Sequence, residues 1–227
     1  MFSKTITCVL SCPYDRTKTE EIRKDAKDVR RIQFPRHLLI IDTETTGLLE
    51  NTNSRIIQLA AVLLDKNSLK EIDTWESLVW TSADSWKKAS KEALKIHGIQ
   101  YKELQQAPDW NQVWEKFLSF FSMDQYDLYG QNIFGFDIPM IKRMCDLYNT
   151  HYPYGRNTER STREIDLWPF FMCSGIFLDL EYGKRYAPLR SMAEHYNIQV
   201  GNKHNALEDC RITAEILRRV GGTLGIR

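Results

Sequence analysis

The pattern of hydrophobic and polar positions changes sharply near residue 36. Between residues 19 and 32 charged residues dominate and few apolar residues are available for burial, which is typical of an exposed helix or a loosely attached arm. Four apolar residues then follow one another from Leu38 to Ile41, as expected of a strand buried on both faces. We therefore expect a charged N-terminal extension over residues 1–35 and a single folded domain over residues 36–227.

The rest of the chain divides into strands and helices by the same pattern. Runs of apolar and β-branched residues predict further strands over residues 55–65, 76–80, 126–129 and 165–167. Apolar residues at helical spacing predict helices over residues 87–97, 110–123, 139–148, 189–196 and 206–220. Three strands come first and strands then alternate with helices, which favours an α/β domain with a mixed central sheet.

Composition excludes several classes of protein without indicating a function. The 227 residues are 42% hydrophobic and 27% charged, as in an ordinary globular enzyme, and 31 basic against 30 acidic residues give no hint of a nucleic-acid partner. No segment approaches the ~20 apolar residues of a membrane span, and the apolar patch near the N-terminus is too short and polar for a signal peptide. The five cysteines are scattered and include no Cys-x-x-Cys pair, so we expect an intracellular, cytoplasmic location.

Asp42 and Glu44 are the first candidates for chemistry. They stand two positions apart at the end of the buried strand, so both side chains point to the same face of the sheet. Two carboxylates at the mouth of an apolar sheet repel each other and lose hydration, and a divalent cation resolves both problems because hard oxygen ligands suit Mg²⁺ or Mn²⁺. A strand end whose acidic side chains protrude into solvent is the alternative for an isolated Asp-x-Glu pair.

Two later segments carry further acidic residues. Asp137 opens the predicted helix after the fourth strand, where an acidic residue also has the plain explanation of helix capping. His204 and Asp209 are five positions apart, and on one helix their side chains would point about 140° from each other. We therefore expect His204 in the loop before the last helix and Asp209 within its first turns.

Three motifs resemble those of the DEDDh exonuclease family, which includes polymerase proofreading exonucleases, ribonuclease T and the three-prime repair exonucleases. They are IIDTETTGL at residues 40–48, YGQNIFGFDIP at residues 129–139 and HNALED at residues 204–209. The resemblance covers residues 36–222 and includes the His-Gly-Ile segment at residues 97–99. Four residues separate Asn132 from Asp137 where many members have three, and this longer form is similar to the three-prime repair exonucleases and to family B polymerases.

The resemblance implies a ribonuclease H-like fold of three layers, with a mixed five-stranded central sheet flanked by helices. It implies a metal-dependent 3′→5′ exonuclease that hydrolyses phosphodiester bonds of DNA or RNA and releases 5′-mononucleotides. Two Mg²⁺ or Mn²⁺ ions would be held by Asp42, Glu44, Asp137 and Asp209. His204 would be the general base, since an ordinary histidine pKa of ~6.5 suits proton transfer near neutrality. The family's substrate-binding positions fall on Thr45, Thr46, Leu48, Asn132 and Phe136.

The implied partner is a nucleic acid with a free 3′ end, single-stranded DNA or RNA, and no membrane; a homodimer or a polymerase partner stays open. Two mixtures of basic residues and tyrosines suit both stacking with phosphate contact and ordinary solvated loops. They are Arg156, Arg160 and Arg163 near Tyr152 and Tyr154, and Lys184, Arg185 and Arg190 near Tyr186. Three alternatives remain: a proofreading subunit of a polymerase assembly, a catalytically inactive nucleic-acid-binding module, and an endonuclease or transposase of the same broad fold.

Overall fold

Five strands form one mixed sheet in the computed structural model, which describes residues 34–121, 126–155, 162–171 and 189–223. The strands are β1 (His37–Thr45), β2 (Ile56–Leu64), β3 (Glu71–Leu78), β4 (Tyr126–Gly130) and β5 (Glu164–Asp166), in the order β3-β2-β1-β4-β5. The pairs β1·β2 and β2·β3 are antiparallel, whereas β1·β4 and β4·β5 are parallel. The predicted α/β fold with a mixed five-stranded sheet is confirmed.

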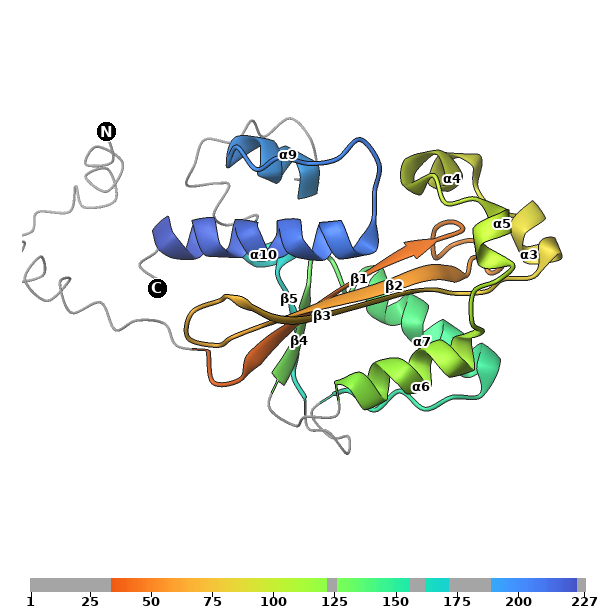
Figure 1. Cartoon of the computed structure of the whole chain (residues 1–227), viewed down its shortest axis with the longest axis horizontal. Coiled ribbons are helices and arrows are strands. Elements are labelled where there is room, and N and C mark those ends of the chain that lie inside the picture. The colour runs from red at the N-terminus through yellow and green to blue at the C-terminus, as the bar shows by residue number, and fades with distance from the viewer. Residues whose placement is uncertain (1–33, 122–125, 156–161, 172–188, 224–227) are drawn as a thin grey trace, which may run out of the picture.

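Helices cover both faces of this sheet (Figure 1). The helices α9 (Leu189–His195) and α10 (Ala206–Thr223) lie on one face, and α6 (Trp110–Phe120) and α7 (Asp137–Tyr148) lie on the other. Three short helices lie beyond the C-terminal end of β1 (Figure 1). They are α3 (Ala83–Lys87), α4 (Lys91–His97) and α5 (Tyr101–Leu104).

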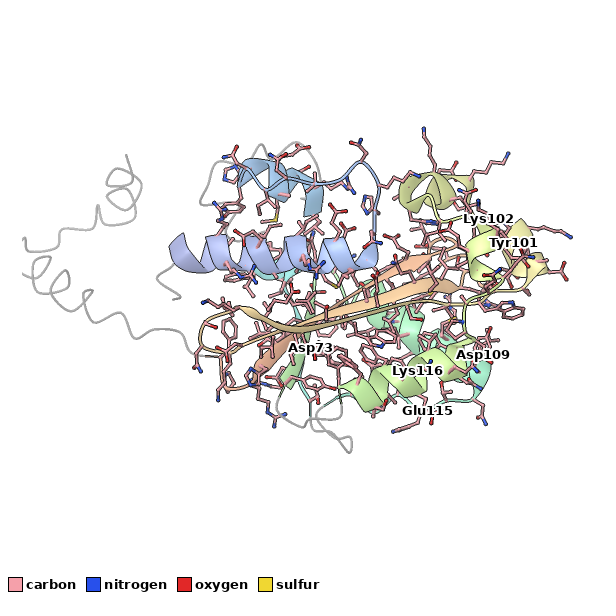
Figure 2. All side chains as sticks on the ribbon, in the orientation of Figure 1. Asp73, Tyr101, Lys102, Asp109, Glu115 and Lys116 are labelled. Carbon is pink, nitrogen blue, oxygen red and sulfur yellow. The ribbon has the colours of Figure 1, made fainter. Side chains whose placement is uncertain are left out.

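The core lies on both sides of β1, which explains the continuous apolar run in the sequence. Leu39 and Ile41 pack in the cluster under α6 and α7, and Leu38 and Ile40 pack in the cluster under α10. All four are buried because a strand alternates its side chains between the two faces of the sheet. Side chains fill both spaces, and charged residues of α6 such as the labelled Lys116 are exposed on its outer side (Figure 2).

Two predicted elements differ from those found. The strand β3 begins at Glu71 and not at residue 76, because its first residues are exposed edge positions that only backbone pairing with β2 defines. The helix predicted over residues 87–97 begins only at Lys91, because α3 ends at Lys87 and Ser90 caps α4 by accepting a hydrogen bond from the Ala93 N–H. The Ser90 N–H also donates to the Thr46 carbonyl at 2.8 Å, which ties α4 to the turn after β1.

Several expectations fall outside the described residues or are tested only within them. The charged segment at residues 19–32 and Cys8, Cys12 and Cys173 lie outside. Cys145 and Cys210 are buried free thiols. None of the helices in the described ranges combines the length and the apolar character that crossing a bilayer requires.

Candidate active site

The first two acidic residues lie within β1 itself, near its C-terminal end. Asp42 is paired with Ala60 and Glu44 with Gln58 of β2, so the backbone of both residues is fixed by the sheet. By alternation their side chains share a face with Leu38 and Ile40, the face that α10 covers. The strand therefore directs both carboxylates toward the start of α10.

Asp137 comes from the opposite layer. It is the first residue of α7, 3% exposed, and its Oδ1 accepts a hydrogen bond of 2.7 Å from the Thr43 hydroxyl of β1. The preceding turn is held by Asp166 at the end of β5, whose carboxylate accepts from the N–H groups of Asn132 at 2.8 Å and Phe134 at 3.2 Å. Asn132 has a left-handed φ of 60°, a conformation that asparagine tolerates well.

His204 and Asp209 occupy the places that the sequence predicts for them. Helix α10 begins at Ala206, so His204 lies in the loop before it and Asp209 in its first turn. Asn205 caps the helix by accepting from the Leu207 and Glu208 N–H groups, each at 3.1 Å. This start brings the His204 Nδ1 atom to 3.0 Å from the Asp209 Oδ2 atom.

One cleft collects these residues. All five residues predicted to be catalytic line it, and so do four of the five predicted substrate-binding residues, namely Thr45, Leu48, Asn132 and Phe136. Thr46 is not part of the lining, because its side chain is buried and its Oγ1 accepts the Arg55 N–H at 2.9 Å. Leu48 is the most exposed large apolar residue of the described chain, at 66%.

The carboxylates of the cleft carry strongly perturbed pKa values. Burial, followed by repulsion from Asp137, Asp209 and Glu44, raises the pKa of Asp42 well above its ordinary value. Burial also raises the pKa of Glu44 to about 7 and that of Asp137 to about 7. Crowded acidic groups in a low-dielectric site resist ionisation unless a positive charge joins them.

A divalent cation fits this site. The Oε1 atom of Glu44 and the Oδ1 atom of Asp209 are buried and have no hydrogen-bond partner among the described residues. Glu44, His204 and Asp209 each place one ligand atom within 4.8 Å of the others. Unpartnered buried carboxylate oxygens are costly, and coordination to a hard cation would satisfy them.

His97 and Arg190 belong to the same site, although the sequence marked His97 only as part of the His-Gly-Ile segment and Arg190 only as one of the basic residues suited to phosphate contact or to a solvated loop. His97 lines the cleft at the end of α4, and its Nδ1 accepts the Ile99 N–H at 3.0 Å. Its Nε2 is buried with no partner in the described chain, and burial, together with the nearby His204, lowers its pKa to about 4. His97 is therefore neutral at physiological pH, with a hydrogen on Nε2. Arg190 of α9 donates from Nε to the His204 Nε2 at 2.9 Å.

The first mixture of arginines and tyrosines has a structural role where it is described. Arg163 forms an ion pair with Asp127, which is fully buried. Tyr154 is buried in the aromatic cluster of α6, and Tyr152 stacks on Trp114. Of the two interpretations left open for this mixture, these contacts favour a structural role for Arg163, Tyr152 and Tyr154. Of the other members of the two mixtures, Arg156, Arg160, Lys184, Arg185 and Tyr186 lie outside the described residues, whereas Arg190 contacts His204.

A cleft that gathers four carboxylates and a histidine at the C-terminal end of the central strand is suited to holding a metal ion. Residues 39–217 match the family model described as exonuclease, RNase_T. The chain belongs to this exonuclease family, and the DEDDh resemblance is confirmed.

Two relatives and one solved structure illustrate the similarity. The chain is 30% identical over 178 residues to a "DNA polymerase III PolC-type" of Caldanaerobacter subterraneus subsp. tengcongensis, covering 78% of this chain but 11% of that relative. It is 29% identical over 184 residues to "Uncharacterized exonuclease CP81" of Escherichia phage 186, covering 79% of this chain and 85% of the phage protein. The nuclease domain of 3'hExo, a DEDDh family member bound to rAMP, superposes with a TM-score of 0.66 at 20% identity, covering 86% of this chain and 96% of that domain. At that identity the superposition shows the fold.

Proposed function

We propose that this protein is a 3′→5′ exonuclease that removes 5′-mononucleotides one at a time from the 3′ end of DNA or RNA. The observation that carries the proposal is the convergence of Asp42, Glu44, Asp137, Asp209 and His204 on one cleft of an exonuclease-family fold. In this proposal residues 36–227 form the exonuclease domain and residues 1–35 a charged extension.

The four carboxylates are the proposed ligands of two Mg²⁺ or Mn²⁺ ions. Such ions, when bound, would lower the pKa of a bound water and neutralise charge on the leaving oxygen. Asp42 and Glu44 offer oxygens from the strand and Asp137 and Asp209 from two helix starts, so three separate elements fix the ligand set.

His204 is the proposed general base. Its Nδ1 lies 3.0 Å from Asp209 Oδ2, which orients the ring and favours the tautomer that carries its hydrogen on Nδ1. The Nε2 atom then has a lone pair and would take a proton from the attacking water. A neutral histidine whose ring is held by a carboxylate suits that task.

The terminal nucleotide would lie between the turn after β1 and the turn before α7. Leu48 is exposed at the rim and would pack against the terminal base, with Asn132 and Phe136 on the other side. Thr45 lines the cleft, whereas Thr46 would contribute only through its backbone because its side chain is engaged with Arg55. His97 lines the same cleft and adds an Nε2–H donor that has no partner among the described residues.

The comparisons support both nucleic acids as substrates. The structural neighbour was bound to rAMP, and the PolC-type relative is by its name a DNA polymerase. The second of these favours one alternative, a proofreading exonuclease that acts with a polymerase partner. A single-stranded 3′ end is the substrate form that we propose for either role; self-association as a homodimer is compatible with both.

The test uses 5′-labelled single-stranded DNA and RNA with Mg²⁺, Mn²⁺ or EDTA. A product ladder that shortens from the 3′ end, stops in EDTA and is blocked by a 3′-terminal phosphate supports the proposal. Internal cleavage of a circular single strand would indicate an endonuclease instead. Binding without degradation under either metal would leave a nucleic-acid-binding module.

A further inference from the structure

Arg190 makes contacts that the proposed ligand set and general base do not explain. Its Nε donates to the His204 Nε2 at 2.9 Å, and its Nη1 donates to the Gly201 carbonyl. Its Nη2 is buried and has no hydrogen-bond partner among the described residues. Buried donors are nearly always satisfied, so this Nη2, which has no partner in the described part of the chain, is a donor that a ligand can engage.

The contact with His204 conflicts with the role of that residue as a base. A neutral imidazole has one N–H and one lone pair, and its Nδ1 lies against Asp209 while its Nε2 accepts from Arg190. The lone pair that must take a proton from water is therefore covered by an arginine N–H. Arg190 and the attacking water cannot occupy it together, so Arg190 must release Nε2 before the base can act.

The charge of the cleft indicates which kind of ligand group could attract the Arg190 guanidinium away from His204. Its lining contains four carboxylates, and none of the lining residues is a lysine or an arginine. Arg190 reaches the cleft through His204, which lines it and accepts the Arg190 Nε–H at 2.9 Å. A phosphate that enters beside these carboxylates needs positive charge in addition to metal, and the planar guanidinium fork matches phosphate oxygens.

We propose that Arg190 is a phosphate-binding residue of this site, held on His204 in the free protein and transferred to a substrate phosphate when a 3′ end binds. The transfer uncovers Nε2 only when substrate is present. The spare Nη2 and the released Nε form a two-pronged contact with one phosphate. This inference rests on the proposed function, since it assigns a phosphate to the same cleft.

The test measures binding of fluorescein-labelled single-stranded DNA and RNA with a free 3′ end by anisotropy at several salt concentrations. Ca²⁺ replaces Mg²⁺, and a gel confirms that the strand stays intact. Arg190→Gln is expected to raise Kd by about tenfold, as for loss of one charged hydrogen-bonded contact. It is also expected to reduce the slope of log Kd against log salt by about 0.7, the value for one phosphate contact on a single strand.

Two further variants test whether the charge of Arg190 or the shape of its guanidinium matters, and whether an arginine outside the cleft has the same effect. Arg190→Lys is expected to restore the salt slope while leaving affinity below that of the wild type, because lysine keeps the charge but not the fork. Arg211→Gln is the control, since Arg211 is half exposed and pairs with Glu71 on the outside of α10. It is expected to leave Kd and slope unchanged.

Equal affinity and equal slope for Arg190→Gln would overturn the inference. So would a loss of kcat with unchanged Kd and slope, which would leave Arg190 as a support for His204 alone. Nitrogen NMR of the unsubstituted protein gives a second test, in which the His204 Nε2 resonance is expected to shift when the oligonucleotide binds. An unchanged resonance at saturation would contradict the transfer even if the variant fails to fold. If Arg190→Gln lowers the affinity and the salt slope as expected, yet the wild type degrades neither strand with Mg²⁺ or Mn²⁺, the proposed function fails and the phosphate contact stands.

Discussion

Buried carboxylates at the two ends of the central sheet differ in whether their oxygens have hydrogen-bond partners. At one end, Asp127 of β4 is fully buried and both of its oxygens are used. Its Oδ1 accepts the Arg163 backbone N–H at 3.0 Å, its Oδ2 accepts the Arg163 guanidinium, and Arg36 lies 3.9 Å away. At the other end, Glu44 and Asp209 each keep a buried oxygen with no partner among the described residues.

The difference shows that this chain can neutralise a buried carboxylate where only stability is at stake. Asp127 has two arginines and a backbone donor, whereas Asp42, Glu44, Asp137 and Asp209 mainly face one another across the cleft. Burial and mutual repulsion raise the pKa of Asp42 as a result. An arrangement that costs stability in the isolated chain is expected where a bound cation offsets the cost.

The largest expected effect comes from Asp42→Asn. We expect nuclease activity to fall by on the order of 10³-fold or more, because the carboxylates act as a unit. The unfolding temperature of the metal-free variant is expected to equal or exceed that of the wild type, since one repelling charge is removed. Activity gels and thermal unfolding in EDTA measure the two quantities. Activity within tenfold of wild type, or a clear loss of stability, would contradict the contrast between the two ends.

His204→Gln is expected to lower kcat by about 10²–10⁴-fold, the range for loss of a general base. Its affinity for Mn²⁺ should change little, because the proposed ligands are the four carboxylates. The measurement is single-turnover kinetics beside a metal titration. Since His204 lies within ligand reach of Glu44 and Asp209, a large loss of Mn²⁺ affinity would instead make it a metal ligand.

Asp127→Asn is expected to have effects opposite to those of Asp42→Asn, with a loss of stability and no loss of activity. It should lower the free energy of unfolding by about 2–3 kcal/mol, less than for a fully buried pair because the Arg163 side chain is 42% exposed and can regain water. The folded variant should keep its activity. Denaturant titration and activity below the transition measure both, and an activity loss without a stability loss would refute the structural role.

The contribution of Glu44 and Asp137 to the stability of the metal-free protein is expected to fall as the pH rises from about 4 to about 7, and the lowered pKa of His97 opposes it only in part. The pKa of Glu44 is raised from 4.5 to about 7 and that of Asp137 from 3.8 to about 7, so between these limits the folded state binds more protons than the unfolded state. Added Mg²⁺ or Mn²⁺ should therefore stabilise the protein more at pH 8 than at pH 5. Thermal unfolding across this range checks the sign, and Glu44→Gln should flatten the profile.

Much of this arrangement could be predicted from local pattern. The apolar run Leu38–Ile41 predicts a central strand, and the spacing of Asp42 and Glu44 predicts that they share a face. The separation of His204 from Asp209 correctly places one before the helix and the other within it. These features depend on the period of a strand or a helix, which the sequence carries directly.

Other features depend on contacts between distant residues and could not be read from spacing. Ser90 divides a continuous helical pattern because its N–H bonds to Thr46, and Thr46 leaves the cleft because its hydroxyl bonds to Arg55. Arg163 and Arg190 come from similar basic stretches, yet one neutralises Asp127 and the other contacts His204. Only the packing of β5 and α9 against the rest of the fold separates these two roles.

The most direct test of the contrast is calorimetric titration of Mn²⁺ into the metal-free wild type and into Asp42→Asn, in two buffers of different ionisation enthalpy. The wild type is expected to bind Mn²⁺ and to release protons near pH 6.5, because Glu44 and Asp137 are partly protonated there. Asp42→Asn is expected to bind Mn²⁺ at least tenfold more weakly, on the scale of losing one hard ligand. Equal binding by both proteins, or none by the wild type, would contradict the claim that the unpaired carboxylates exist to hold a cation.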